Sequence, residues 1–469
     1  MGDSAPYDYD VIVLGAGPGG YVCAIRCSQL GLKTAIVDRE WLGGVCLNVG
    51  CIPSKALLKN AEVVRLLLHH GPDFGFEVKE PRVDYGAAVK RSRQVSARLV
   101  KGVEFLMRKN KIDVRLGVGR LSAPDRLELT EPNGKVTTLR GRHLVLATGA
   151  RAALLPGMQV DGKKILTYRE AILQETLPSS VTIVGAGPIG LEFATLWNSY
   201  GVKVTLLEML PRIAPLEDEE ISAELAKAFK RSGVELRTGT RVEGIETGGK
   251  KVRLRVSGDG KAEELEADQV LVATGFRPNS EDLGLEALGV KVEQGRVEVD
   301  QRLATNVPGI WAIGDVTGRL MLAHVASAMG IVCAENIAGS PSNPLKYEMM
   351  PRGIFSHPQV ASFGLTETQA RDRGYEVRIG RFPFQANGKA LGLGDSTGFV
   401  KIVSEARYGE ILGAHLVGVE VTELLPELTL AQEMELTAEQ IGRNVHLHPT
   451  LGEAVMEAAH GLAGGYINI

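Results

Sequence analysis

The sequence predicts an α/β protein in which two related βαβ domains precede a C-terminal α+β domain. Three observations predict this architecture: an internal repeat, a high glycine content, and a change near residue 350, after which glycine motifs give way to strand and helix patterns. The chain has 469 residues, of which 44% are hydrophobic and 56 are glycine, so it can form several cores joined by tight turns. Disorder is thereby excluded as its main state.

The internal repeat consists of two segments offset by 170 residues. In each copy an apolar strand, a glycine turn, a helix, a second apolar strand and an acidic residue follow one another, which is typical of a Rossmann-like dinucleotide-binding unit. The matching positions are Gly15, Gly17, Gly20 and Asp38 in the first copy, and Gly185, Gly187, Gly190 and Glu208 in the second.

Each position of the motif has a physical reason. The first glycine allows a tight turn, the second lets the backbone approach a pyrophosphate, and the third lets helix and strand pack closely. The helix N-terminus attracts phosphates, and the acidic residue can bind ribose hydroxyls. One such turn could serve packing alone, but two copies in register predict two bound dinucleotides. Apolar strands that end in Ala-Thr-Gly are expected to close the two domains, at Thr148, Gly149 and Gly275.

Charge and composition exclude several classes of function. The 53 basic and 56 acidic residues leave a formal net charge of −3, which favours neither nucleic acid nor an anionic membrane as a partner. The N-terminal residues show no secretory signal, and no apolar run is long enough for a membrane span. Five cysteines are too few for a secreted disulfide scaffold, so a reducing compartment is expected.

Cys46 and Cys51 lie in the run GGVCLNVGCIPSK, at the start of a helical pattern. A helix N-terminus lowers the pKa of a thiol, which favours a redox-active pair. A structural disulfide and half of a metal site are the alternatives, although a metal would need two further ligands that do not follow nearby, so no metal is expected. Cys23, Cys27 and Cys333 are expected to be core residues.

The run GGVCLNVGCIPSK resembles the active-site signature of the flavin disulfide oxidoreductases, class I of the pyridine nucleotide-disulfide oxidoreductases, and in detail that of the members that oxidise dihydrolipoamide. The resemblance covers essentially the whole chain, with GAGPGG, GAGPIG, ATGFRPN, WAIGD, LAHVASAMG, SHPQVASFGLTE and HLHPTLGE as further motifs. It implies FAD at the first glycine motif and NAD at the second. It also implies a flavin contact for Asp315 and, at a helix N-terminus, for Ala323.

The resemblance further implies a disulfide between Cys46, facing substrate, and Cys51, nearest the flavin. It divides the chain into an FAD-binding domain (residues 1–150), an NAD-binding domain (151–277), a central domain that completes the FAD site (278–349) and an interface or dimerisation domain (350–469). Lys55 and Glu192 form a family pair expected beside the flavin and the nicotinamide, although Lys55 could be an ordinary surface lysine.

Oxidation of a dithiol requires a base, and His448 in HLHPTLGE is the candidate, with Glu453 orienting its ring. Thr450 and Glu453 also have the spacing of a helix capping box, and the residues alone leave both roles of Glu453 open. The resemblance, in which a His–Glu pair from one subunit completes the site of the other, favours the functional role and implies a homodimer. His446 is expected to be structural.

The expected function is flavin-dependent oxidation of protein-bound dihydrolipoamide to lipoamide with reduction of NAD. The resemblance implies a shared subunit of 2-oxo acid dehydrogenase complexes, whose partner is the lipoyl domain of an acyltransferase subunit. It places the protein in the cytoplasm, or in the mitochondrial matrix if the chain is a processed eukaryotic one.

Glu208, followed by the neutral Met209 and Leu210, favours NAD over NADP. Asp38 is shorter than the glutamate common in the family. The alternatives are an NADPH-dependent disulfide reductase of the same family and a redox-silent flavoprotein scaffold. Ile189 and the cysteine-free tail GGYINI oppose the first, and the presence of every active-site residue opposes the second.

Overall fold

The computed structural model describes residues 7–155, 157–258 and 260–469, which form two compact units. Unit 1 comprises described residues up to Ala56, then Val89–Ala153 and Phe276–Tyr347. Unit 2 comprises Leu57–Ala88, Leu154–Gly275 and Glu348–Ile469. Helices α3 (Cys51–Arg65) and α4 (Tyr85–Lys109) contribute residues to both units.

A seven-stranded sheet forms the centre of unit 1, with the order β3-β2-β1-β6-β5-β4 and with β19 also paired to β6. Strands β1, β2, β3, β6 and β19 pair in parallel, whereas β4 and β5 form an antiparallel extension of β6. The strands are β1 (Tyr9–Leu14), β2 (Thr34–Asp38), β3 (Asp113–Leu116), β4 (Val118–Ala123), β5 (Arg126–Thr130), β6 (Val136–Leu146) and β19 (Ile310–Ala312).

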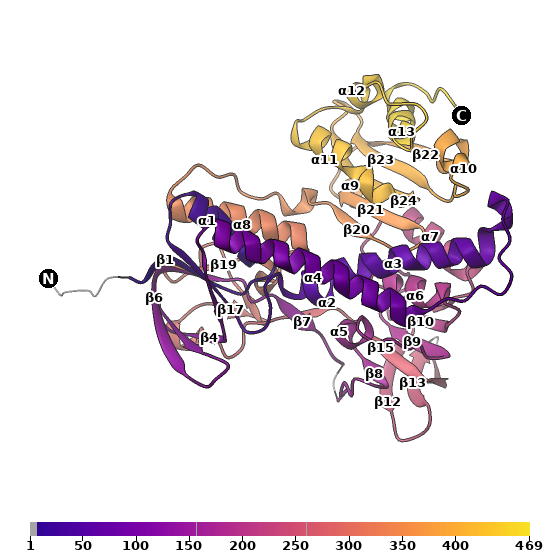
Figure 1. The fold of residues 1–469 in the computed structure, drawn as a ribbon. Helices are drawn as coiled ribbons and strands as arrows, with labels where there is room; N and C mark the ends of the chain where they lie inside the picture. The colour runs from indigo at the N-terminus through magenta and orange to yellow at the C-terminus, as the bar shows by residue number, and fades with distance from the viewer. Residues whose placement is uncertain (1–6, 156, 259) are drawn as a thin grey trace. The chain divides into compact units, whose positions relative to one another are not determined.

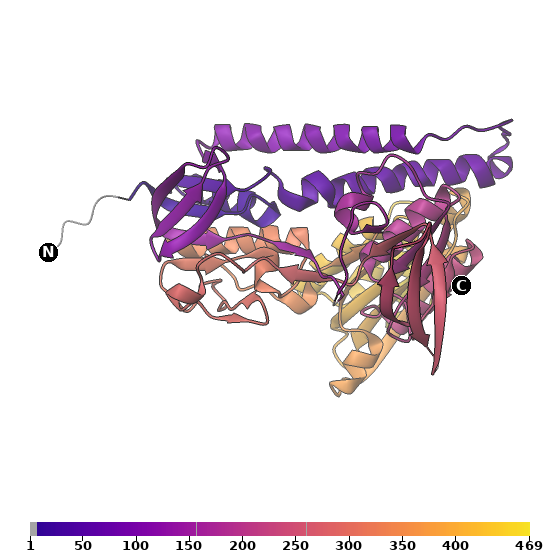
Figure 2. The same ribbon diagram turned by 90° about the horizontal axis from the view of Figure 1, so that it is seen from below.

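Two helices of unit 1 lie side by side, α1 (Pro18–Gln29) and α8 (Ala323–Ala338) (Figures 1 and 2). They approach so closely that a Cβ at Gly330 of α8 would stand 2.6 Å from the carbonyl oxygen of Gly19. The remaining elements of this unit are α2 (Gly44–Val49), β7 (Ala150–Ala152), β16 (Phe276–Pro278), η3 (Glu286–Leu288), β17 (Val292–Glu293), β18 (Arg296–Val297), η4 (Gly314–Thr317) and η5 (Tyr347–Met349), the last of which ends in unit 2.

Unit 2 contains a second parallel sheet, with the order β11-β10-β9-β15-β8, and a three-stranded antiparallel sheet, β12-β13-β14. Its strands are β8 (Ile165–Leu166), β9 (Ser180–Val184), β10 (Lys203–Leu207), β11 (Glu235–Arg237), β12 (Arg241–Glu246), β13 (Val252–Gly258), β14 (Lys261–Ala267) and β15 (Gln269–Val272). The helices around them are α5 (Tyr168–Ala171), α6 (Pro188–Ser199) and α7 (Glu219–Arg231), and the turns η1 (Leu66–His70) and η2 (Pro72–Phe74) follow α3.

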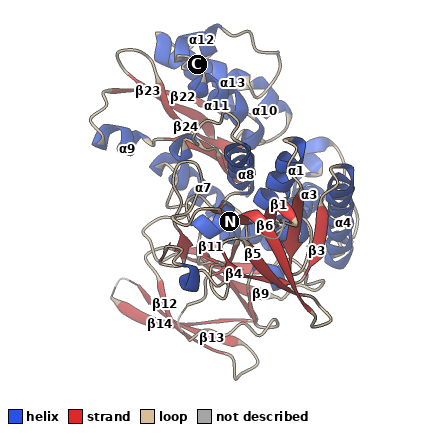
Figure 3. Cartoon of the chain, turned by 90° about the vertical axis from the view of Figure 1, so that its left-hand side faces the viewer, coloured by secondary structure: helices blue, strands red, loops and turns tan. Residues whose placement is uncertain are grey.

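The C-terminal part of unit 2 is an antiparallel sheet, β20-β21-β24-β23-β22, with α11, α12 and α13 packed against one face (Figure 3). Its strands are β20 (Arg352–Ile354), β21 (Gln359–Gly364), β22 (Val377–Pro383), β23 (Phe399–Glu405) and β24 (Ile411–Gly418). The helices and turns are α9 (Glu367–Asp372), η6 (Phe384–Ala386), α10 (Gly388–Gly392), η7 (Val421–Glu423), α11 (Leu425–Glu433), α12 (Ala438–Arg443) and α13 (Glu453–Ala463).

The two copies of the predicted sequence repeat have equivalent structures. Strand β1 lies between β2 and β6, and β9 lies in the same way between β10 and β15. The N–H of Gly15 donates to Val37 at 2.7 Å, and that of Gly185 donates to Leu207 at 2.8 Å. Two βαβ repeats in parallel strand pairs, with a C-terminal α+β segment, confirm the predicted fold class. The division at residues 150, 277 and 349 stays a prediction.

No helix in the described part of the chain combines the length and hydropathy needed to cross a membrane.

Alanine substitutions in the second glycine turn should separate the structural glycines from the open one. A Cβ at Gly190 would stand 1.9 Å from the carbonyl oxygen of Gly185, so Gly190→Ala should lower the free energy of unfolding by about 1–3 kcal/mol. At Gly187 a Cβ would meet nothing within 4 Å, so Gly187→Ala should cost less than about 1 kcal/mol. Urea unfolding measures both, and equal losses would contradict this assignment.

Candidate active site

The first glycine motif forms the turn between β1 and α1. A Cβ at Gly15 would stand 2.1 Å from the carbonyl oxygen of Ala147, and one at Gly20 would stand 1.8 Å from that of Gly15. At Gly17, in contrast, a Cβ would meet nothing within 4 Å. The turn is therefore closed against the protein on two sides and open at its second glycine, where helix α1 begins. This opening fits a pyrophosphate at the N-terminus of α1.

The two predicted ribose carboxylates are held by the glycine turns themselves. Asp38 accepts hydrogen bonds from the N–H groups of Ala16 at 2.7 Å, Glu40 at 2.8 Å and Trp41 at 3.1 Å. Glu208 accepts from the N–H groups of Ala186 at 2.8 Å and Leu210 at 2.9 Å. Because an ionised carboxylate has about four acceptor positions, both keep capacity for a ribose hydroxyl, and Glu208 keeps more.

Asp315 lies in unit 1 at η4, directly after β19. Burial raises the pKa of its carboxyl to about 6, and no described residue donates a hydrogen bond to that carboxylate. A half-buried carboxyl without a protein partner fits a ligand that brings hydroxyl groups, as the predicted flavin ribityl chain would. Ala323 is the first residue of α8 in the same unit, so its N–H lies at a positive helix end.

Thr148 and Gly149 lie directly after β6, as predicted. The Thr148 hydroxyl donates to the carbonyl oxygen of Asn279 at 2.7 Å. The side-chain amide of Asn279 in turn donates to the carbonyl oxygen of Thr148 at 3.0 Å. Gly149 has a φ of +71°, which a residue with a side chain rarely adopts. These contacts fix the end of the strand that follows the glycine turn.

Cys46 and Cys51 lie on two different helices, α2 and α3, which meet at Gly50. A Cβ at Gly50 would stand 2.9 Å from the carbonyl oxygen of Val45 and 3.2 Å from the Cα of Cys46, so the glycine allows the start of α3 to approach Cys46. Both cysteines are thiols in this structure, and the thiol of Cys46 is hydrogen-bonded to Cys51.

The acidity of the pair differs from the prediction in one respect. The bond to Cys51 and burial raise the pKa of Cys46 well above its usual value, although Lys55 lowers it. The expected lowering by a helix N-terminus therefore does not extend to Cys46, because its hydrogen bond to Cys51 and its burial both favour the protonated thiol.

Two further side chains lie close to the pair. Lys55 is half-buried one helical turn after Cys51, and its charge acts on Cys46, which is not the behaviour of an ordinary surface lysine. Tyr21 of α1 was missed by the sequence analysis, although burial and then both cysteines raise the pKa of its phenol. Its signal in the sequence is a large ring with a hydroxyl group directly after the glycine turn.

The second glycine motif in unit 2 reproduces the first. A Cβ at Gly185 would stand 2.4 Å from the carbonyl oxygen of Ala273, while one at Gly187 would meet only open space. Gly275 has a φ of +111° after β15. Glu192 of α6 is buried, and its carboxylate accepts a hydrogen bond from the N–H of Phe355 at 3.1 Å. The second turn therefore also fits a dinucleotide, within unit 2.

His448 and Glu453 contact each other in unit 2. The Nδ1 of His448 lies 2.9 Å from a carboxylate oxygen of Glu453, and the other oxygen accepts the N–H of Thr450 at 2.9 Å. Although burial alone would raise it, Thr450 and His448 hold the pKa of Glu453 below its usual value. Glu453 is therefore anionic and accepts a hydrogen bond from the Nδ1–H of His448, which leaves Nε2 as the basic nitrogen.

Only one of the two hydrogen bonds of a capping box is formed at Glu453, namely the one that its carboxylate accepts from the N–H of Thr450. Helix α13 begins at Glu453, and the Thr450 hydroxyl donates to the carbonyl oxygen of Leu447 rather than capping the helix. The side chain of His448 is 79% exposed in the single chain. His446 is different, because its two ring nitrogens contact Asn444 and Glu427 at 2.9 and 3.0 Å, as a structural role requires.

Each unit thus brings together part of the predicted site. Unit 1 holds the first glycine motif, both cysteines, Lys55, Asp315 and Ala323, and unit 2 holds the second glycine motif, Glu192, and the His448–Glu453 pair. The chemistry available is a redox-active dithiol, two dinucleotide turns and an exposed imidazole base.

Comparison with known proteins agrees with this geometry. Residues 9–330 match the family model described as pyridine nucleotide-disulphide oxidoreductase, and residues 350–459 match that family's dimerisation domain. The chain is 52% identical to the dihydrolipoyl dehydrogenase of Mycobacterium leprae, over 98% of this chain and 99% of that protein. It is 49% identical, with the same coverage, to that of Corynebacterium glutamicum.

Among solved structures, LpdA from Mycobacterium tuberculosis superposes with a TM-score of 0.90 at 26% identity, covering 96% of this chain and 99% of that one.

The half-buried carboxyl of Asp315 should make the cofactor-free protein less stable above about pH 6 than at pH 4. Its pKa is raised in the folded state, so stability falls as pH rises from about 4 through 6, by about 3 kcal/mol in total. Asp315→Asn should therefore stabilise the cofactor-free protein at pH 8 and change little at pH 4. Thermal unfolding at both pH values measures this, with the exposed Asp372→Asn as control. A gain that does not depend on pH would contradict it.

Proposed function

Because the chain belongs to the pyridine nucleotide-disulphide oxidoreductase family, we propose that it is a dihydrolipoyl dehydrogenase, which oxidises dihydrolipoamide to lipoamide and reduces NAD to NADH. The observation that carries this proposal is the contact between the side chains of Cys46 and Cys51, in the same unit as the open turn at Gly17 and the unpartnered carboxyl of Asp315. Relatives with this name match the chain over nearly its full length.

The residues fit the two cofactors of such an enzyme. Gly15, Gly17, Gly20, Asp38, Thr148, Gly149, Asp315 and Ala323 would hold FAD, and Gly185, Gly187, Gly190, Glu192, Glu208 and Gly275 would hold NAD. The predicted division assigns these roles to residues 1–150, completed by 278–349, and to residues 151–277. When bound, FAD supplies an acceptor for an electron pair and a hydride donor to NAD. Lys55 would stabilise negative charge beside the flavin, with Glu192 balancing it.

The dithiol chemistry follows from the cysteine pair. In the oxidised enzyme, a substrate thiolate attacks the Cys46 sulfur of the Cys46–Cys51 disulfide, and Cys51 leaves as a thiolate. The second substrate thiol loses its proton to a base and attacks the substrate sulfur of the mixed disulfide, which breaks the bond to Cys46. Cys46 leaves as a thiolate and takes that proton from the base. Lipoamide departs with its own disulfide closed, and the enzyme holds the electron pair as the Cys46 thiol and the Cys51 thiolate.

His448 is the base that we assign to this proton transfer, in the site of a partner subunit. Its Nε2 is available because the Nδ1–H donates to Glu453, and its ring projects from the surface of the single chain. The matched dimerisation domain includes it. A homodimer would therefore form two sites, each with cysteines from one chain and His448 and Glu453 from the other.

We also infer NAD rather than NADP as the acceptor, because the Glu208 carboxylate would repel a 2′-phosphate. The substrate would be a lipoyl group carried on a domain of an acyltransferase subunit in a 2-oxo acid dehydrogenase complex, in the cytoplasm. The NADPH-dependent disulfide reductase is disfavoured by the same carboxylate.

A steady-state assay of the purified protein tests the reaction. Dihydrolipoamide with NAD should give turnover at least about 100-fold faster than glutathione disulfide with NADPH, since repulsion of the 2′-phosphate and the wrong disulfide both oppose the second pair. Anaerobic dihydrolipoamide should also reduce the flavin of the wild type but not that of Cys46→Ser, which lacks the attacked sulfur. Faster turnover with NADPH would overturn the proposal.

Mixed dimers test the role of His448. The homodimers of Cys46→Ser and of His448→Gln should each lose at least about 100-fold in turnover, because one lacks the attacked sulfur and the other lacks the base. Coexpression should restore about a quarter of wild-type activity, since half of the dimers are mixed and each has one complete site. No restoration would contradict a base supplied by the partner. His446→Gln, in the same loop, serves as the matched control.

A further inference from the structure

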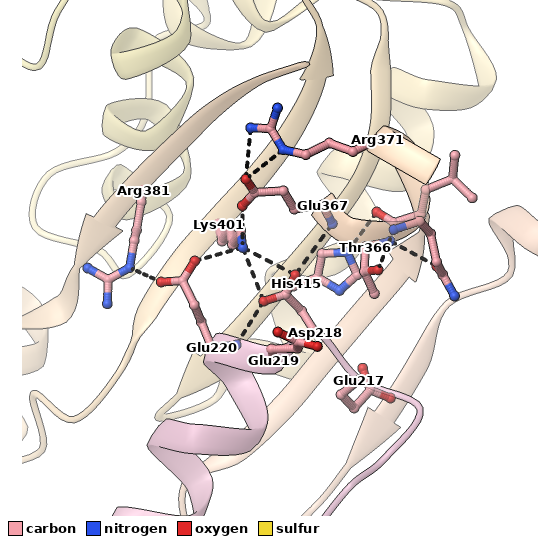
Figure 4. A network of polar contacts seen from close by, with 12 residues as sticks. Glu217, Asp218, Glu219, Glu220, Thr366, Glu367, Arg371, Arg381, Lys401 and His415 are labelled. Carbon is pink, nitrogen blue, oxygen red and sulfur yellow. Dashed lines mark hydrogen bonds and ion pairs between the residues drawn. The ribbon is translucent and has the colours of Figure 1, made fainter. Parts of the chain in front are cut away.

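A buried lysine lies at the centre of a polar network in unit 2 (Figure 4). Lys401 of β23 is 2% exposed, and its Nζ lies 3.1 and 3.2 Å from the carboxylate oxygens of Asp218, 2.7 Å from Glu220 and 3.0 Å from Glu367. A charged amine is seldom buried so completely unless it is paired. Three carboxylates from two different segments therefore converge on one amine.

Two arginines pair with the outer carboxylates of this network. Arg381 binds the outer oxygen of Glu220 at 3.0 Å, and Arg371 binds Glu367 at 2.9 Å. Burial alone would lower the pKa of Lys401, but Glu220 and Glu367 raise it, so the amine keeps its charge. Lys401 lies on the face of the C-terminal sheet opposite to α11–α13, since its neighbours Val400 and Ile402 belong to the core on the other face.

Asp218 and Glu220 lie at the end of a segment, residues 208–220, that begins at Glu208, the predicted ribose carboxylate. Glu208 accepts the N–H of Ala186 in the glycine turn, and the N–H of Ala214 donates to the carbonyl oxygen of the same Ala186 at 2.9 Å. The segment continues to Asp218, which caps α7 by accepting the N–H of Glu220 at 3.0 Å. Residues 208–220 are thus tied to the glycine turn at one end and to Lys401 at the other.

A second contact holds the same end of the segment. Glu217 is buried, and its carboxylate accepts the hydroxyl of Ser362 of β21 at 2.5 Å. Ser362 and Lys401 both belong to the C-terminal sheet, within residues that match the dimerisation domain. That sheet therefore fixes the far end of the segment that carries Glu208.

We propose that Lys401 is a positioning residue for NAD, which fixes the 208–220 segment so that Glu208 stands ready for the ribose. This inference rests on the proposed binding of NAD at the second glycine motif. Without Lys401, Asp218 and Glu220 lose their shared partner, the segment becomes looser, and part of the binding energy of NAD goes into ordering it. The cysteine pair lies in unit 1, whereas this segment belongs to unit 2.

Lys401→Met tests the inference in the intact holoenzyme. The KM for NAD and the dissociation constant for NAD should both rise about tenfold, as loss of one charge-assisted contact predicts. The rate at which dihydrolipoamide reduces the flavin without NAD should stay within about twofold of the wild type. Lys401→Arg, which keeps the charge, should restore most of the affinity. Lys389→Met, at an exposed lysine of α10, is the matched control.

Each result decides the inference. A lower melting temperature with an unchanged KM for NAD would show a structural role only and overturn it, as would equal losses in both half-reactions. If Lys401→Met does not fold, Ser362→Ala loosens the segment more gently and should raise the KM for NAD about threefold, and no rise would overturn the inference. A wild type that does not use NAD would instead refute the proposed function.

Discussion

The close approach of backbone to backbone at the glycine turns is the constraint on which the rest of the structure depends. The carbonyl oxygens of Gly15 and Gly185 occupy the places where side chains of Gly20 and Gly190 would begin. Only this approach brings the helix start, the following strand and the acidic residue together around one opening.

The two copies of the repeat form equivalent hydrogen bonds, but these bonds hold different segments in the two units. In both, the residue after the first glycine gives its N–H to the acidic side chain, and its carbonyl oxygen receives an N–H from the segment beyond, from Gly43 in one copy and Ala214 in the other. In the first copy that segment leads into α2 and Cys46. In the second it leads to Asp218 and Lys401. The two copies therefore share this pair of hydrogen bonds, whereas the segments that the bonds hold differ.

The sequence was sufficient for those parts of the molecule that depend on local backbone. The glycine turns, their flanking strands and the contact of His448 with Glu453, five residues apart, follow from short patterns and were predicted. The break between α2 and α3 at Gly50, the position of Tyr21 beside the cysteines and the Lys401 network were not. Each of these depends on segments brought together only by the tertiary fold, and a lysine inside an apolar strand does not reveal which carboxylates will surround it.

The exposed ring of His448 has a consequence for how the protein would behave on dilution. A solitary subunit would keep its folded domains, its thiol pair and its bound nucleotides, yet its imidazole would face bulk water instead of a substrate sulfur. Specific activity would then fall with protein concentration while the spectrum of the prosthetic group stayed the same. Association of the subunits would therefore activate the enzyme, and the dissociation constant of the dimer would set the protein concentration at which activity appears.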